Sequence, residues 1–415
     1  DTIGSLVGMF DLYRGRIDTA LAAAVPILER GGVSADARVD AALTASAGYA
    51  LRGRPADAIT VVDNNIALAL QQPEVSSIAA GALMATRLLA QSMDGRLIEA
   101  LESARVVYDL AVDMGTHDGV AGLSFAIGQL HELLGDIDSA RRHLAEGVAL
   151  LREHDRNGYL PWCLAELAHA HLLAGEIDDA AAALAEADRH EQRDLRLFRP
   201  RVDTARHLLE SVTEPERGVA GLVRTAEDAF DDGHLVLAAM AYHEAVRFGG
   251  AHVVAGPLAR IVVATDSGLV RALAMHARAA SAVNGDDLDD VATTFESMGG
   301  LLWAVDAASA AADAHEQSGQ NARRLASRQR SESILDRCAG AAPPWIVRSA
   351  SAQLSARELE VAELAAAGHT SREIAERLYV SVRTVDNHLY RLYAKLGVDN
   401  REDLAVVFRL RRASE

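Results

Sequence analysis

The stretch LSFAIGQLHELLGDIDSARRHLAEGVALL, residues Leu123 to Leu151, decides the fold of most of this chain. Apolar residues at helical spacing occur on both sides of Gly135, and a glycine at such a point can take the left-handed conformation that ends one helix and turns the chain into the next. Ala140, early in the second pattern, is small enough for the two helices to approach closely. The stretch therefore predicts a hairpin of two antiparallel helices.

The same pattern, Gly-x-(Ile/Leu/Pro)-x-x-Ala, recurs through residues 1 to about 340. It occurs at Gly15/Ile17/Ala20, Gly53/Pro55/Ala58, Gly95/Leu97/Ala100, Gly135/Ile137/Ala140, Gly175/Ile177/Ala180 and Gly233/Leu235/Ala238. The first five glycines are 38, 42, 40 and 40 residues apart, whereas later units around Gly285 and Gly319 match only in part. Since a hairpin exposes an apolar face that only a neighbouring hairpin can cover, we predict an all-α chain in which residues 1–339 form a helical-hairpin repeat solenoid.

A different pattern occupies the C-terminal end, LSARELEVAELAAAGHTSREIAERLYVSVRTVDNHLYRLYAKLGVDNREDL, residues 354 to 404. Ser355 with Glu358, and Thr370 with Glu373, have the spacing of capping boxes at helix starts. Gly368 follows the first helix at the position of a C-terminal cap. These features predict short helices over about 355–367 and 370–379.

A third helix is predicted from its cap at Ser381 to Gly397. Val385, Leu389 and Leu392 have the spacing of one buried face. The opposite face carries Arg383, Asp386, Asn387, Tyr390, Arg391 and Ala394. A fourth helix is predicted from about residue 400 through Leu404, Val407 and Phe408. This layout is typical of a helix-turn-helix domain that reads DNA, with the polar face of the third helix as the reading surface.

The order TS-x-EIA-x-x-L-x-V-S-x-x-TV-x-x-H-L-x-x-x-x-x-KLGV resembles the LuxR-type (GerE) output domain of bacterial transcription regulators. The resemblance implies that the third helix enters the major groove and that the fourth often supplies a dimer contact. It places Arg383 and Thr384 on the phosphate side and Asp386, Asn387 and Tyr390 opposite the bases. The predicted DNA-binding residues are Ser381, Arg383, Thr384, Asp386, Asn387, Tyr390, Arg391 and Lys395.

One position departs from the family, which commonly has lysine where this chain has Asp386. A carboxylate is repelled by phosphates unless it accepts a hydrogen bond from cytosine or pairs with a neighbour such as Arg383 or Tyr390. Asn387 can make a two-bond contact to adenine, and Arg391 can contact guanine or, as the interpretation we favour, phosphate. His388 is interpreted as a packing residue.

The repeats resemble tetratricopeptide repeats, as in the large MalT-like subgroup of LuxR-type regulators. That resemblance implies an ATPase domain upstream, and because the sequence begins with Asp1 we expect it to be the C-terminal part of a longer chain. Residues 340–353, GAAPPWIVRSASAQ, combine prolines with small polar residues and predict a linker between the array and a DNA-binding domain at 354–415.

Charge divides the chain. Residues 350–415 contain ten basic and ten acidic residues, so residues 1–349, with 31 basic and 49 acidic residues, carry the whole net charge of −18. An acidic array disfavours nonspecific association with DNA. The DNA contact is therefore expected to be confined to the third helix and its surroundings, and to require two copies of the chain.

Enzymatic functions find little support in the sequence. Lys395 is the sole lysine of the chain, which excludes a phosphate-binding GxxxxGK[ST] loop and a lysine Schiff base. HExxH and GxSxG are also missing. We expect no enzyme activity and no cofactor in this chain. The nearest metal-like cluster is Cys163, Glu166, His169 and His171, but these residues share one predicted helix, so we favour a partly buried helix over a metal site.

Two cysteines cannot make a disulfide framework, and the sequence has neither a signal peptide nor an apolar run long enough for a membrane. We therefore expect a cytoplasmic transcription regulator that binds promoter DNA as a homodimer, with RNA polymerase as a further partner. A small-molecule or protein effector on the array is expected to control it, although the array can instead be a spacer or dimer scaffold. The alternative function is a scaffold for protein partners whose terminal domain has weak or lost DNA binding.

Overall fold

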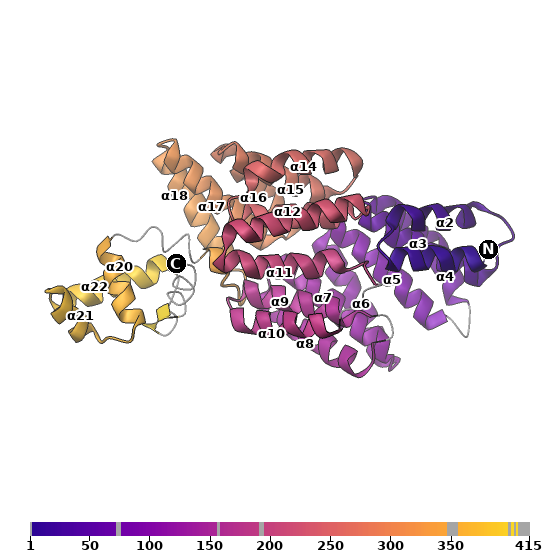
Figure 1. Ribbon diagram of the computed structural model, residues 1–415, viewed down its shortest axis with the longest axis horizontal. Coiled ribbons are helices and arrows are strands. Elements are labelled where there is room, and N and C mark those ends of the chain that lie inside the picture. Colours follow the sequence, from indigo (N-terminus) through magenta and orange to yellow (C-terminus); the bar gives the residue numbers. More distant parts are fainter. Residues whose placement is uncertain are drawn as a thin grey trace.

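The computed structural model describes residues 2–71, 76–155, 158–190, 195–346, 356–396, 400–401 and 404–405, without the side chains of residues 76–78, 356, 391 and 394–396. Its regular elements in these ranges are helices (Figure 1). They are α1 (Thr2–Tyr13), α2 (Ile17–Glu29), α3 (Ala35–Leu51), α4 (Pro55–Leu70), α5 (Ser76–Met93), α6 (Leu97–Asp113), α7 (His117–Leu134), α8 (Ile137–Glu153), α9 (Leu160–Leu173), α10 (Ile177–His190), α11 (Arg199–Thr213), α12 (Pro215–Asp231), α13 (Leu235–Val246), α14 (Ala251–Ala264), α15 (Gly268–Ser281), α16 (Gly285–Met298), α17 (Leu301–Gln317), α18 (Asn321–Leu335), α20 (Ala356–Ala366), α21 (Ser371–Leu378) and α22 (Val382–Leu396).

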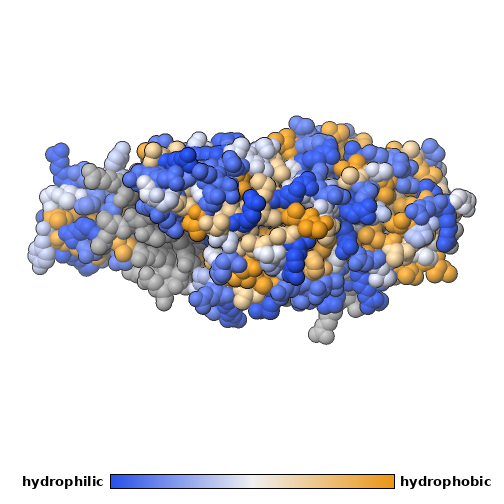
Figure 2. All heavy atoms as spheres, turned by 90° about the horizontal axis from the view of Figure 1, so that it is seen from above, coloured by the Kyte–Doolittle hydropathy of each residue, from blue (hydrophilic) through white to orange (hydrophobic). Residues whose placement is uncertain are grey.

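Helices α1–α18 pair in chain order into nine hairpins within the described residues. The odd-numbered helices also pack against the next odd-numbered helix from α1 to α17, so they form an inner layer covered by the even-numbered helices. The predicted all-α hairpin array is confirmed. Figure 2 shows a face on which hydrophilic residues predominate and apolar residues gather in small patches.

The first five predicted glycine turns are confirmed. Gly15, Gly53, Gly95, Gly135 and Gly175 have φ between +70° and +84° and join the two helices of one hairpin. Gly233, with φ +88°, also ends one helix and begins the next, but it joins α12 to α13, the even-numbered helix of one pair to the odd-numbered helix of the following pair. The hairpin turn before it lies at Glu214, where Pro215 starts α12. A proline at the first helical position can begin a helix without glycine, so the repeat changes its sequence pattern there.

The array is a superhelix whose successive turns contact each other. Besides their neighbours, α3 contacts α13, α5 contacts α15 and α7 contacts α17, each pair being five hairpins apart. Backbone groups join the two superhelical turns: the amide of Asp266 donates to the carbonyl of Gly53 at 2.8 Å, and the amide of Arg196 donates to the carbonyl of Tyr13 at 2.8 Å. The hydroxyl of Ser267 likewise donates to the carbonyl of Met93 at 2.5 Å. The two superhelical turns are therefore in direct contact.

The first residues of the predicted linker pack against the array. The amide of Ala342 donates to the carbonyl of Leu173 at 2.8 Å. Trp345 packs its ring edge-to-face on Phe248, with centroids 5.5 Å apart, and the guanidinium of Arg247 lies 5.0 Å from the Trp345 ring centroid. Residues 340–346 thus lie against the array, and residues 347–355 lie outside the described residues.

The turn glycines allow the two superhelical turns to touch, which gives a first prediction. Gly53→Ala is expected to cost more than the roughly 1–2 kcal/mol of a left-handed non-glycine residue. Its Cβ would lie 2.7 Å from Thr265 Cγ2, on the second superhelical turn. Gly319→Ala is the matched control, since φ is +73° there and no atom lies within 4 Å of the new Cβ. Urea unfolding of both variants measures the difference, and equal losses would show that the contact contributes nothing.

The C-terminal helices α20, α21 and α22 enclose a separate core. Its buried members are Val361, Ala362, Ala365, Ile374, Ala375, Val385, Leu389, Leu392 and Leu404. The burial of Leu404 shows that the chain after α22 returns to this core, as the predicted fourth helix requires; Val407 and Phe408 of that helix lie outside the described residues. None of the described helices has the length and apolar character needed to cross a bilayer.

Candidate functional site

The start of α22 is fixed by its own side chains. The amide of Thr384 donates to Ser381 Oγ at 3.1 Å, and the two hydroxyls are 2.7 Å apart. Ser381 is therefore the predicted cap. The bond between the two hydroxyls uses one of their two hydrogens, so the start of α22 presents its exposed amino end together with one remaining hydroxyl hydrogen.

The two predicted faces of α22 are confirmed. Val385, Leu389 and Leu392 are buried against α20 and α21. The exposed residues are Arg383, Asp386, Asn387 and Tyr390, of which Tyr390 is 78% exposed. The side chains of Arg391 and Lys395 lie outside the described residues, and His388 is half-buried.

The helix before the turn is held at both ends. Thr370 and Glu373 form the predicted capping box at the start of α21. At its end, Arg357 of α20 donates to the carbonyl of Leu378 at 2.6 Å. The second contact ties the end of α21 to α20. The capping role predicted for Ser355 lies outside the described residues.

Two residues near this surface were not found from the sequence. Tyr379, in the turn between α21 and α22, has φ +54° and is 96% exposed. Its hydroxyl is open to solvent near the start of α22, where a phosphate-contacting donor would lie. Arg401 donates to Ser371 Oγ at 2.7 Å and to the carbonyl of His369, and so ties the chain after α22 to the start of α21. An exposed aromatic residue in the predicted turn was the available indication for Tyr379.

Asp386 gives a prediction about DNA affinity. Among the described side chains, no hydrogen bond or ion pair joins it to Arg383 or Tyr390, so its charge is not neutralised by either. Asp386→Lys is expected to raise the affinity for any duplex and to steepen the dependence of log K on log salt by about one unit per phosphate gained. Titrations of duplex DNA at several salt concentrations measure the slope. Asp386→Asn separates loss of repulsion, which leaves the slope unchanged, from a new phosphate contact.

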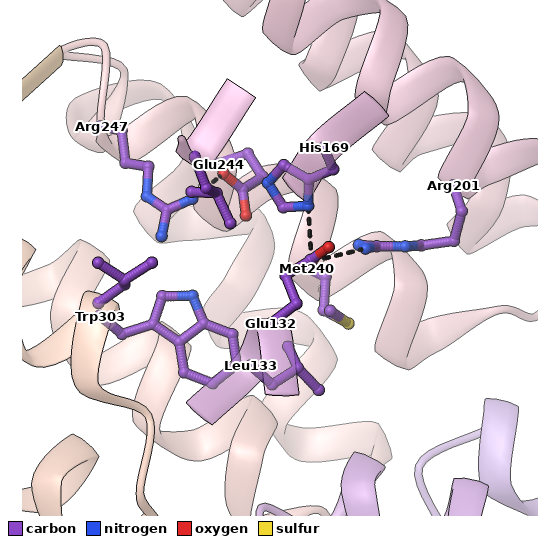
Figure 3. Close-up of a pocket in the computed structure, with 10 residues that line it drawn as sticks. Glu132, Leu133, His169, Arg201, Met240, Glu244, Arg247 and Trp303 are labelled. Carbon is purple, nitrogen blue, oxygen red and sulfur yellow. Dashed lines mark hydrogen bonds and ion pairs between the residues drawn. The ribbon is translucent and has the colours of Figure 1, made fainter. Parts of the chain in front are cut away.

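A second group of polar residues lies at the axis of the array. We call it the axial cluster; it consists of Glu132, Glu166, His169, Arg201, Glu244, Arg247 and Asp306 (Figure 3 shows most of it). All but Arg247, which directly follows α13, come from α7, α9, α11, α13 and α17, and each of these helices is part of the inner layer. The cluster therefore joins hairpins of both superhelical turns.

Specific pairs account for most of the charges. Arg201 donates to both carboxylate oxygens of Glu166, at 2.7 and 2.6 Å. Arg247 pairs with Glu244 at 2.5 Å and with Asp306 at 2.7 Å. Glu166 Oε1 also accepts from Gln129 at 3.0 Å and Trp162 at 2.8 Å. Such bidentate, hydrogen-bonded geometry is what a buried ion pair needs to offset desolvation.

The remaining pair is Glu132 with His169, whose nearest oxygen and Nδ1 are 2.8 Å apart. Burial raises the pKa of Glu132, and His169 acts in the opposite direction. Burial also opposes protonation of His169, but the Glu132 carboxylate outweighs it and raises the pKa of the imidazole. Both shifts favour the protonated form of each group.

The cluster is not built for a metal ion. Ligand atoms of Glu132, Glu166 and His169 lie within 4.8 Å of one another. However, both Glu166 oxygens are occupied by Arg201, whose guanidinium also lies 3.8 Å from Glu132. A cationic guanidinium at that distance repels a divalent ion.

The metal-like grouping considered from the sequence does not assemble either. Cys163 donates to the carbonyl of Leu144, and His171 pairs with Glu176 at 2.6 Å. A second surface group, His171, Glu176 and Asp179, is partly exposed, and such acidic groups are common without an ion.

The capped α21, the tight turn at Tyr379 and the exposed polar face of α22 define a helix-turn-helix domain. Residues 352–408 match the family described as bacterial regulatory proteins, luxR family. The C-terminal domain is therefore a LuxR-family helix-turn-helix domain, as the motif predicted.

The curated relatives share this domain. The oxygen regulatory protein NreC of Staphylococcus aureus (strain JH9) is 47% identical over 51 residues, which are 12% of this chain and 24% of NreC. NreC of strain Mu3 / ATCC 700698 matches over the same lengths with the same identity. The chain thus spans about a quarter of the length of these relatives.

The array has structural likenesses of its own. The crystal structure of a Rap protein complexed with competence and sporulation factor superposes with a TM-score of 0.52 at 12% identity, over 81% of this chain and 97% of that one. This likeness is one of fold, and it agrees with the predicted tetratricopeptide-like array.

Proposed function

We propose that this protein is a transcription regulator that binds promoter double-stranded DNA through α22. The observation that carries the proposal is the exposed polar face of α22, with Asn387 at its middle, in a helix-turn-helix domain of the LuxR family. A helix of this width fits the major groove, where base edges carry a distinct donor and acceptor code.

The residues of this face have different tasks in the proposal. The exposed amino end of α22 and Arg383 contact phosphate and set the register, assisted by Tyr379. Asn387 makes two hydrogen bonds to an adenine, and Tyr390 lies one helical turn further along the groove. Arg391 and Lys395 are proposed as further phosphate contacts from the sequence. Because few basic side chains contribute, two copies of the domain bind two half-sites about one helical turn apart.

The rest of the chain regulates this domain. The proposed division is an array at 1–339, a linker at 340–353 and the DNA-binding domain at 354–415, in a cytoplasmic homodimer that acts on RNA polymerase. An effector bound by the array supplies control. The Rap protein, which has the same fold, was crystallised with competence and sporulation factor, and this supports an array that takes up a partner.

In a second candidate function, the array has a role but the terminal domain does not bind DNA. A carboxylate at Asp386, without a partner among the described side chains, weakens binding to a phosphate-lined groove. The chain would then be a scaffold for protein partners whose terminal domain no longer reads DNA.

Selection from random duplexes separates the two functions. The full chain is incubated with a pool of random duplex DNA at low and at physiological salt, and the retained fraction is sequenced. We expect a two-fold symmetric motif that Asn387→Ala removes, at a cost of about 1–3 kcal/mol for the lost base contact. Glu363→Ala, an exposed change on α20, is the control and should leave the motif unchanged. Failure to retain any duplex at low salt would contradict the proposal and favour the scaffold.

A further inference from the structure

A small cavity lies inside the axial cluster (Figure 3). Its volume is about 20 Å³, enough for one water-sized group. Its charged lining residues are Glu132, His169, Arg201, Glu244 and Arg247. Its apolar lining residues include Leu133, Met240 and Trp303. The cavity is thus lined by both charged and apolar side chains.

Two polar atoms of residues that line the cavity have no hydrogen-bond partner among the described residues. They are Glu132 Oε2 and His169 Nε2, and the two residues are only 4% and 6% exposed. The contact between Glu132 Oε1 and His169 Nδ1, at 2.8 Å, fixes the orientation of both groups. An unpaired buried acceptor on a carboxylate costs free energy, so an occupant that donates a hydrogen bond to Glu132 Oε2 would be stabilised.

The charged groups of the cluster determine whether that occupant is a cation or an anion. Four carboxylates, Glu132, Glu166, Glu244 and Asp306, face two guanidinium groups. The guanidinium groups are engaged with Glu166, Glu244 and Asp306. Glu132 is the carboxylate of the four without a close guanidinium partner, since Arg201 lies 3.8 Å away and its nearest contact is the imidazole of His169 at 2.8 Å. A buried carboxylate without a guanidinium partner favours a positively charged occupant over an anion.

We propose that this cavity binds the primary ammonium group of a ligand, with Glu132 Oε2 as its principal hydrogen-bond acceptor and Trp303 as the aromatic residue of its lining. An ammonium group is of water size, carries one positive charge and offers three donors. A guanidinium or quaternary ammonium group is too large for the volume, and a divalent metal is disfavoured by Arg201. The aromatic ring adds attraction for a desolvated cation.

The site is next to the segment that leads to the DNA-binding domain. Arg247 lines the cavity, and its guanidinium also lies 5.0 Å from the ring centroid of Trp345. Trp345 belongs to the packed residues 340–346, and α20 begins at Ala356. Occupation of the cavity therefore acts on a residue that touches this segment. This inference rests on the proposed function, in which an effector binds the array, and it assigns that effector to the class of primary ammonium compounds.

Calorimetric titration of the full chain with methylammonium chloride, at constant pH and ionic strength, tests the site. We expect saturable binding and a raised Tm, and no such response to tetramethylammonium chloride, which is too large. Triglycine amide, which presents a peptide amino group, distinguishes a peptide source from a small amine. Equal responses to methylammonium and tetramethylammonium in the unaltered protein would overturn the proposal, whatever any variant does.

Variants locate the binding. Glu132→Gln keeps the shape of the side chain and is expected to weaken methylammonium binding about tenfold or more, because a charged hydrogen bond is lost. Glu186→Gln, a surface carboxylate paired with Arg152, is the matched control and should bind normally. Unchanged binding by a folded Glu132→Gln protein would overturn the assignment.

DNA binding is measured on the same samples. If the unaltered protein binds methylammonium but does not bind DNA, the proposed function is contradicted and the cation site is supported. Intact DNA binding without methylammonium binding overturns the cation site alone.

Discussion

Arg201→Met is expected to destabilise the array by about 3–5 kcal/mol, because it leaves a buried carboxylate without its cation. Arg201 is 7% exposed and Glu166 is 1% exposed. After the substitution, Glu166 keeps the hydrogen bonds from Gln129 and Trp162 but loses both bonds from the guanidinium. Urea unfolding followed by far-UV circular dichroism measures the change in the free energy of unfolding.

Two comparisons make this prediction specific. Arg152 forms the same two-bond contact with Glu186, at 2.7 and 2.6 Å, but its side chain is 52% exposed. Arg152→Met should therefore cost less than about 1 kcal/mol. The double variant Arg201→Met with Glu166→Leu should recover part of the loss, since it removes the stranded charge. Equal losses at the two arginines would contradict the argument from burial.

Acid is expected to destabilise the array by several kcal/mol through buried histidines, at about 1.36 kcal/mol per pKa unit for each. His243 Nε2 and His276 Nδ1 are 2.8 Å apart, and both residues are 1% exposed. Burial lowers the pKa of both residues, with Arg247 acting in the same direction, and it brings the pKa of His276 to about 3. Phe295 and Trp303 pack beside the pair and offer no charge to compensate.

The direction of the pH dependence follows from these pKa values. An unfolded histidine titrates near 6.5, so below this pH the unfolded chain binds protons that the folded pair does not bind. The contribution of this pair to stability is constant above about pH 7 and becomes unfavourable as pH drops from about 6.5 toward about 3. At pH 5 the loss is about 2 kcal/mol for His276, from about one and a half pKa units at about 1.36 kcal/mol, and His243 acts in the same direction. His169 and Glu132 act oppositely, because their folded pKa values are raised and they favour the folded state as pH falls.

Variants separate these contributions. His276→Gln should reduce the loss between pH 7 and pH 5 by about 2 kcal/mol, even if it lowers stability at pH 7. His190→Gln, at an exposed position, is the control. Urea unfolding at each pH gives the slopes, and a slope that His276→Gln leaves unchanged would show that another group governs the acid transition.

Local features of the fold were predictable from the sequence. The turn at Gly135 and the capping box of Thr370 with Glu373 depend on residues close together in the chain, and both are found as expected. The buried and exposed faces of α22 follow from helical periodicity. Gly233 shows the limit of such a pattern, since a glycine ends a helix whether it joins two helices of one hairpin or two successive hairpins.

The contact between the two superhelical turns was not predictable in this way. His234 contacts the carbonyl of Gly15 across 219 residues, and Ser267 contacts Met93 across 174 residues. No local pattern specifies which distant turn a glycine will meet. The axial cluster could have been suspected, because Glu132, Glu166 and Arg201 recur about once per repeat on successive inner helices. Their pairing still depends on how successive hairpins are rotated.

Contact between the two superhelical turns depends on the number of hairpins that lie between the contacting helices. In an open solenoid, each hairpin contacts only its neighbours, so units can be added or removed at an end with a local effect. Here α3 meets α13, α5 meets α15 and α7 meets α17. Inserting one hairpin between them would shift every later partner by one position and mismatch all three contacts together. Duplication of a single unit between α7 and α13 would therefore cost the contacts between the two superhelical turns as well as the local ones, which an open solenoid would not lose.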